Sequence, residues 1–139
     1  APPPPLRGPD GLPKYGAVKT TVDGITFASQ KEAKRYGELK LLEKAGKVRA
    51  LRTQPHYALC ALVIDNADVR DINKGTNSAR RHPVAEYIAD FEYEESEIHG
   101  FGGMTWRLVV EDVKGMKTDV YRLKKRWFEA QYGVQIKEV

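Results

Sequence analysis

The hydrophobic residues of the chain follow two spacings, one typical of strands and one typical of helices. Short β-branched runs at 20–22 and 25–27 flank Asp23-Gly24, which predicts a β-hairpin with a tight turn. Ser29-Gln30-Lys31-Glu32 then has the S-x-x-E spacing of a capping box, and the apolar residues after it recur every three or four positions. The pattern therefore predicts a helix over residues 30–45 that ends at Gly46.

Longer apolar runs predict the remaining elements. Residues 57–65 and 83–93 are expected to form strands, joined by a polar connection over 66–82, and residues 106–113 are expected to form a third strand. A second helix should follow, capped by Thr118 or Asp119 and ended by Gly133, before a short final strand within 134–139. The apolar face of that helix is expected to consist of Val120, Leu123, Trp127 and Ala130.

These elements predict an α/β fold with the core order α-β-β-β-α-β and a small hairpin in front. The 139 residues are enough for one hydrophobic core, so we expect a single domain over 17–139. Residues 1–16 hold six of the eight prolines and little apolar periodicity, which predicts a flexible N-terminal arm.

Composition excludes several classes of protein. One cysteine, Cys60, rules out an intrachain disulfide framework and a four-cysteine zinc site. The longest uninterrupted apolar run, 57–64, is far too short to cross a bilayer, and no apolar signal-peptide segment is present near the first residue. We therefore expect a cytoplasmic protein without a membrane partner.

Charge is sorted along the chain. Residues 17–52 carry nine Lys/Arg and four Asp/Glu, residues 86–112 carry eight acids and one base, and residues 114–126 carry six bases and one acid. An acidic centre between basic segments is what a metal site beside a phosphate-binding surface requires, although a solvated helix face would also give the last basic run. The basic residues proposed to contact nucleic acid are Arg80, Arg81, Lys117, Lys124 and Lys125.

Asp112-Val113-Lys114 closes the third predicted strand, and alternation puts its acid and its lysine on one face. Asp90 lies among apolar neighbours in the preceding strand, so antiparallel pairing would set Asp90 beside Asp112. Two carboxylates about 4 Å apart repel by roughly 4 kcal/mol at an effective dielectric constant near 20, and a hard cation such as Mg²⁺ removes that repulsion. A surface salt bridge between Asp112 and Lys114 is the alternative.

These residues resemble a known family. Asp90 with Asp112-x-Lys114 matches the signature of the PD-(D/E)XK, or restriction-endonuclease-like, nucleases, whose core has the order α-β-β-β-α-β and a central mixed sheet flanked by helices. Ala89 stands where the signature has proline, and Glu32 fits the glutamate that many members carry on the first helix. The chain is most similar to phage junction-resolving nucleases and to transposase-associated nucleases. The segments FASQKEAKRYGELKLLEKAG, YIADF and VVEDVKGMKTDVYRLKK also resemble small phage-encoded proteins of poorly defined function.

The resemblance, which covers about 14–139, implies a Mg²⁺-dependent endodeoxyribonuclease acting on branched or Holliday-junction DNA as a homodimer in a bacterial host cell, of phage or prophage origin. Mn²⁺ can substitute for Mg²⁺ in such sites. The implied catalytic residues are Glu32, Asp90, Asp112 and Lys114, with the three acids as metal ligands. The alternative is a non-catalytic phage accessory protein that binds nucleic acid or protein and retains the nuclease fold.

Two of these site assignments have an alternative interpretation. Glu32 is also the N3 residue of the capping box, where its carboxylate would bond back to the Ser29 amide. Glu111 precedes Asp112, and a twist or bulge at the end of the strand would exchange the two side chains. We favour Asp112 because the D-x-K spacing to Lys114 requires it.

Overall fold

The computed structural model describes residues 18–64 and 79–139, which fall into two compact units, 1–51 and 52–139. Each unit is described by itself. The predicted N-terminal arm over 1–16 and most of the polar connection over 66–82 lie outside the described residues. The expectation of one domain over 17–139 stays a prediction. In the described part of the chain, no helix is both long and apolar enough to cross a membrane.

The first unit contains the predicted hairpin and helix. Strands β1 (Thr20–Val22) and β2 (Ile25–Phe27) pair antiparallel around Asp23 and Gly24, whose φ angles of 51° and 75° give the turn that Asp-Gly favours. Helix α1 (Gln30–Lys44) begins after Ser29, whose hydroxyl accepts the Glu32 amide at 3.2 Å. The hairpin, the cap and the helix are therefore confirmed.

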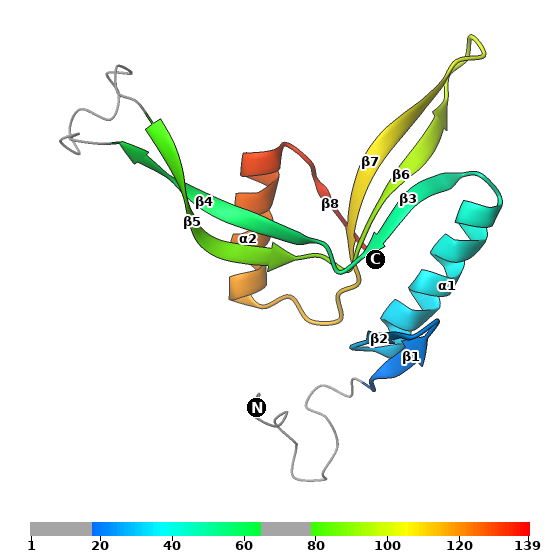
Figure 1. The fold of residues 1–139 in the computed structure, drawn as a ribbon, viewed down its shortest axis with the longest axis horizontal. Coiled ribbons are helices and arrows are strands. Elements are labelled where there is room, and N and C mark those ends of the chain that lie inside the picture. The colour runs from blue at the N-terminus through cyan, green and yellow to red at the C-terminus, as the bar shows by residue number, and fades with distance from the viewer. Residues whose placement is uncertain (1–17, 65–78) are drawn as a thin grey trace. The chain divides into compact units, whose positions relative to one another are not determined.

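A four-stranded sheet has the order β3-β6-β7-β8 (Figure 1). Strands β6 (Phe91–Ile98) and β7 (Met104–Asp112) pair antiparallel, and β8 (Ile136–Glu138) pairs with β7 in parallel. Strand β3 (Val48–Thr53), which the sequence did not predict, contributes its last residues to the second unit, where Arg52 forms a 3.0 Å ion pair with Glu92. The sheet is mixed, so the general α/β class is confirmed.

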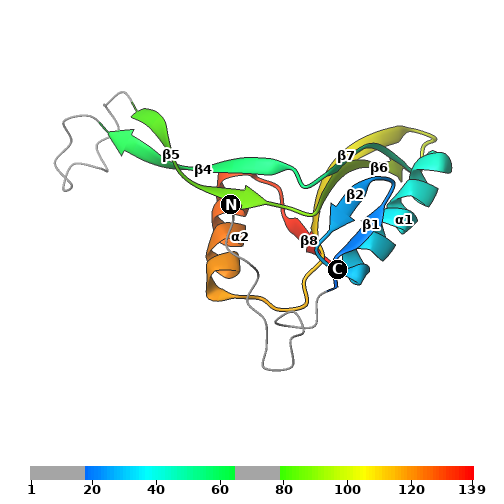
Figure 2. The ribbon, with the colours of Figure 1, turned by 60° about the horizontal axis from the view of Figure 1, so that its bottom comes forward.

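Strands β4 (His56–Ile64) and β5 (Ala79–Ile88) form a separate antiparallel pair that packs across α2 (Figures 1 and 2). The chain passes between this pair and the four-stranded sheet at two neighbouring corners. The two corners are joined to each other by hydrogen bonds from the Gln54 amide to the Asp90 carbonyl (2.9 Å) and from the Ala89 amide to the Pro55 carbonyl (3.2 Å). The single strand predicted over 83–93 is therefore wrong: it is two strands that belong to different sheets.

Helix α2 (Asp119–Tyr132) starts at its predicted cap, Thr118, and ends at Gly133, whose φ of 68° is the left-handed conformation that glycine favours. The predicted apolar face is only partly correct: Trp127 packs against the core, but Val120 and Leu123 are 63% and 60% exposed. The helix instead buries Tyr121 and Phe128, which pack with residues of both sheets in one core: Leu59, Tyr87, Ala89, Val110 and Ile136. Aromatic rings bury more area than valine or leucine, so they decide which side faces inward.

Candidate active site

The end of β7 presents two fully buried acids on opposite faces of the sheet, Glu111 and Asp112. Glu111 accepts a 2.8 Å hydrogen bond from the Tyr93 hydroxyl, which Lys137 also contacts at 3.4 Å. Asp112 lies on the other face, next to Tyr87. The strand keeps its regular alternation here, so Glu111 and Asp112 do not exchange places.

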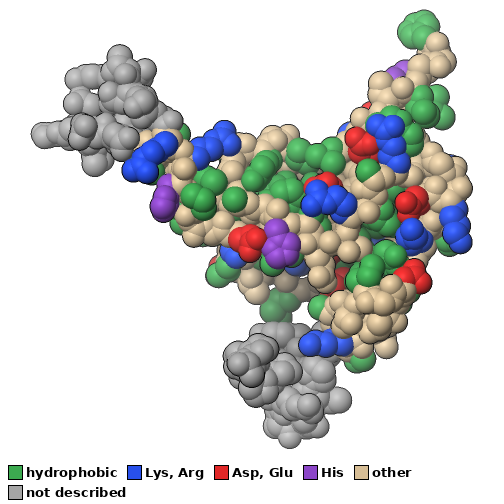
Figure 3. All heavy atoms as spheres, in the orientation of Figure 1, with side chains coloured by type: hydrophobic (Ala, Val, Ile, Leu, Met, Phe, Trp, Pro, Cys, Tyr) green, Lys and Arg blue, Asp and Glu red, His purple; other side chains and the backbone are tan. Residues whose placement is uncertain are grey.

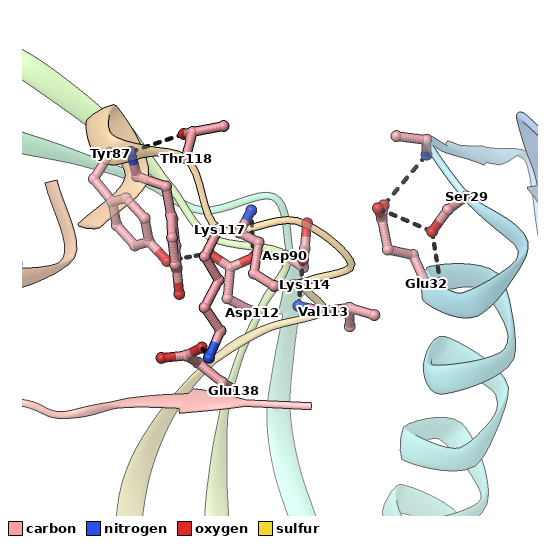
Figure 4. Close-up of polar contacts among 12 residues, drawn as sticks. Ser29, Glu32, Tyr87, Asp90, Asp112, Val113, Lys114, Lys117, Thr118 and Glu138 are labelled. Carbon is pink, nitrogen blue, oxygen red and sulfur yellow. Dashed lines mark hydrogen bonds and ion pairs between the residues drawn. The ribbon is translucent and has the colours of Figure 1, made fainter. Parts of the chain in front are cut away.

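Both oxygens of Asp112 face a polar partner (Figure 4). The Tyr87 hydroxyl donates a hydrogen bond to Oδ2, and the Lys114 Nζ lies 2.7 Å from Oδ1. The same Nζ is 4.7 Å from the centre of the Tyr121 ring, a cation–π distance. The expectation that Asp112 and Lys114 share a face is confirmed. The ion pair that we kept as the alternative is also present, but its carboxylate is buried rather than on the surface.

Asp90 occupies the corner between β5 and β6. Its carboxylate accepts the Val113 amide at 2.6 Å, and its own amide donates to the Glu111 carbonyl at 3.1 Å. The predicted antiparallel pairing is confirmed, because the register joins Phe91 to Glu111 and so sets Asp90 beside the end of β7. Asp90, in the corner before β6, thus lies near Asp112 at the end of β7 (Figure 4).

A third carboxylate, Glu138, is the register partner of Asp112 in β8. Lys117 contacts Glu138 at 2.5 Å and Lys125 also forms an ion pair with it. Hydrogen bonds from these two lysines lower the pKa of Glu138, and the bond to Glu138 raises the pKa of Lys125. Two of the lysines proposed to contact DNA therefore already neutralise a carboxylate beside the site.

The two tyrosines at the site stay protonated over a wide pH range. Burial, followed by the contact with Asp112, raises the pKa of Tyr87 well above the ordinary tyrosine value. Burial and the charge of Asp112 raise the pKa of Tyr121 in the same direction. Tyr87 is therefore a fixed proton donor to Asp112, while the buried Tyr121 hydroxyl finds no hydrogen-bond partner in the described part of the chain.

The remaining predicted DNA contacts are Arg80, Arg81 and Lys124. Arg80 and Arg81 are exposed in β5, not in a loop as predicted, and basic side chains gather at this end of the β4–β5 pair (Figure 3). Lys124 is half-buried on α2. Their contact with nucleic acid stays a prediction.

Glu32 belongs to the first unit and completes a capping box there. Its carboxylate accepts the Ala28 amide at 3.2 Å and the Ser29 hydroxyl at 3.1 Å (Figure 4). The backbone partner is the Ala28 amide instead of the expected Ser29 amide. Its role as a metal ligand stays a prediction.

The oxygen atoms of Asp90 and Asp112 suit a hard cation in charge and chemistry. Asp112 Oδ1 is buried and makes no hydrogen bond within the described residues, with only the Lys114 ammonium against it. Over residues 18–64 and 79–139, no three or more His, Cys, Asp or Glu side chains converge closely enough to hold a metal. Mg²⁺ fits such a pair nevertheless, because it keeps several waters and takes one or two protein carboxylates together with substrate phosphates.

Residues 12–138 match the model of a family described as "Protein of unknown function (DUF1064)". The chain belongs to the DUF1064 family. No curated protein and no solved structure shows a significant match. Because the description of DUF1064 assigns no activity, the side chains around Asp112 are the basis for assigning one.

Sequence reasoning missed three residues at this site: Tyr87, Tyr121 and Glu138. Tyr87 precedes Asp90 by three positions, within an apolar run that gave no sign of a polar role. Glu138 follows from the parallel register of β7 and β8, which a three-residue strand does not reveal. Tyr121 could have been suspected from its place beside the capping Thr118, in the first turn of a helix that follows the D-x-K strand.

Proposed function

We propose that this chain is a metal-dependent nuclease that hydrolyses phosphodiester bonds in DNA. The observation that carries the proposal is the fully buried Asp112, paired with Lys114 at 2.7 Å and set beside Asp90. A buried carboxylate is costly unless charge compensates it, and hydrophobic replacements of buried ion pairs are often as stable or more so. The pair is therefore better explained by chemistry than by stability.

Asp90 and Asp112 would hold the divalent ion, with Mg²⁺ as the expected metal and Mn²⁺ as its substitute. Bound there, the ion would polarise a phosphate and lower the pKa of a water. Lys114 is 27% exposed, so its ammonium can reach a substrate phosphate and neutralise the charge that develops on it. Tyr87 fixes the orientation of Asp112 through its hydrogen bond, and the Tyr121 ring supports the ammonium of Lys114.

The finer predictions form part of the same proposal. The mixed sheet with α2 and β8 would represent the restriction-endonuclease-like core, although five strands rather than three lie between the helices in the described chain. Glu32 would be the third metal ligand. The substrate would be branched or Holliday-junction DNA, cut by a homodimer in the cytoplasm of a bacterial host.

A cleavage assay tests the proposal. We expect the chain with Mg²⁺ to cut a four-way junction faster than the duplex or single strand of the same sequence. Asp112→Asn should abolish cutting, and Lys114→Ala should lower the single-turnover rate at saturating DNA while leaving junction affinity nearly unchanged. Glu111→Gln is the matched control, because it changes a buried acid of the same strand on the opposite face.

Calorimetry tests the metal separately. Mg²⁺ or Mn²⁺ should bind the wild-type chain, and Asp90→Asn should weaken that binding severely while Glu111→Gln should not. Unchanged binding in Asp90→Asn, or no cleavage of any DNA by the wild type with either metal, would contradict the nuclease proposal.

A non-catalytic nucleic-acid-binding protein is the second candidate. It is favoured by two observations: the Glu32 carboxylate serves a helix cap, and Asp112 is already neutralised by Lys114. Junction binding that needs no metal and survives Asp112→Asn, together with no cleavage, would select this candidate.

A further inference from the structure

A second site lies where the β4–β5 pair meets α2. It is an open pocket of about 340 Å³, lined by Cys60, Leu62, Arg81, Trp127, Ala130 and Gln131. The pocket combines one aromatic ring, one cation and short apolar side chains. Leu62 is 64% exposed beside it, so the pocket opens to solvent.

Trp127 is held rigidly at this pocket. Its indole Nε1 donates to the Cys60 carbonyl at 3.1 Å, and the Gln131 side chain bonds the Cys60 amide at 2.8 Å and the Ala58 carbonyl at 2.9 Å. These backbone groups are available because β4 pairs with β5 in a sheet of two strands, so its other edge faces α2. The Trp127 ring is therefore held in place without a ligand. Stacking of a base on this ring then costs little conformational entropy of the side chain.

We propose that this pocket binds one unpaired nucleotide of a DNA strand, with the base against Trp127 and a phosphate on Arg81. Proteins bind single-stranded nucleic acid with aromatic rings and neighbouring cations. Every base has a flat face that can stack on the ring, and every phosphodiester linkage carries a negative charge. The inference deepens the proposed function, since it rests on DNA being the substrate. A junction or flap supplies unpaired nucleotides, whereas an intact duplex does not.

Helix α2 connects this pocket to the candidate active site. Tyr121, which contacts Lys114, and Trp127 lie six residues apart on α2, and six residues span about 9 Å along a helix axis. Lys124 lies between them on the same helix. A strand whose phosphate is at Lys114 can therefore continue along α2 toward Trp127 within a few nucleotides.

The test measures binding to two labelled single strands in EDTA, one of normal oligothymidylate and one of the same length with abasic sugars in place of nucleotides. The wild type should prefer the normal strand by about fivefold or more, because each stacked base contributes at least that much. Trp127→Leu should bring the preference close to one, and Trp127→Phe should retain most of it. Trp106→Leu, which changes the only other tryptophan, should leave it unchanged.

Arg81→Gln should weaken binding of both strands and reduce the slope of log affinity against log salt by about 0.7, the value for one phosphate contact on a single strand. Circular dichroism confirms that each variant is folded. A preference that persists in Trp127→Leu would overturn the proposal. So would a Trp127→Leu variant that changes the sedimentation coefficient of the chain but not its binding of oligothymidylate, because the surface would then be a protein interface.

The assay distinguishes this inference from the nuclease proposal. It contains no metal and needs no cleavage, so Glu111→Gln, the control variant of the cleavage assay, should behave as the wild type in it. A normal base preference without any cleavage activity would support the pocket and reject the enzyme. Cleavage without a base preference would support the nuclease proposal and reject the nucleotide-binding pocket.

Discussion

Replacing Lys114 by methionine should destabilise the second unit by about 2–3 kcal/mol. Removing one partner of a buried ion pair costs about 3–5 kcal/mol, because the other charge is left uncompensated. Here Lys114 is 27% exposed, so water can partly replace it, and the Tyr87 hydroxyl still donates to Asp112. Both features place the expected cost at or below the lower end of that range.

Urea unfolding measures this cost. The chain's two tryptophans, Trp106 and Trp127, both lie in the second unit, so their fluorescence follows that unit. With a urea m-value of about 2 kcal/mol/M, the unfolding midpoint of Lys114→Met should fall by about 1–1.5 M. Lys124→Met, which changes a half-buried lysine of α2, is the control and should shift the free energy of unfolding by less than about 0.5 kcal/mol.

The double variant Asp112→Asn/Lys114→Met decides the cause. If an uncompensated charge is responsible, removing that charge as well should recover more than about 1 kcal/mol in a double-mutant cycle. A loss in Lys114→Met no larger than that in Lys124→Met would refute the reasoning, because the ion pair would then behave as a solvated contact.

Two further predictions concern pH. The pKa of Glu138 is lowered by Lys117 and Lys125, so its contribution to stability is full above the ordinary glutamate pKa and is lost as the pH falls through the lowered value. Glu138→Gln should therefore flatten the acid side of a plot of Tm against pH, and an unchanged acid side would contradict the contact. The pKa values of Tyr87 and Tyr121 are raised, so both hydroxyls should remain protonated above the ordinary tyrosine pKa until the chain unfolds. Tyrosinate absorbance, compared with that of the chain in guanidinium, should show a deficit in this range, and a titration identical to that of the unfolded chain would disprove the burial.

Local signals predicted the first unit well. Asp23-Gly24 dictates its turn because both positions have positive φ, and Ser29 with Glu32 dictates the start of α1 through hydrogen bonds four residues apart or less. Thr118 and Gly133 fixed the ends of α2 in the same way. Caps and turns are encoded within a few residues, so a sequence shows them directly.

Long-range packing could not be predicted in this way. Helix α2 carries two apolar stripes, and periodicity cannot tell which one meets the Tyr87 and Leu59 core. The run from Tyr87 to Tyr93 looks continuous, yet it breaks at Asp90, where the backbone bonds to Gln54, between β3 and β4, and to Glu111 of β7. Strand alternation alone was enough to place Asp112 and Lys114 on one face of β7. The prediction of the site was incomplete at Glu138, because the place of Glu138 depends on the register of β8.

The corner at Asp90 joins the β4–β5 pair to the four-stranded sheet at the candidate site. Strand β5 runs for ten residues, about 33 Å at the usual rise, and Arg80 and Arg81 lie at its far end. At the near end, the Asp90 carbonyl, amide and carboxylate are bonded to Gln54, Glu111 and Val113. Three segments of the chain therefore hold Asp90, and a substitution that shifts the backbone of any of them should displace its carboxylate.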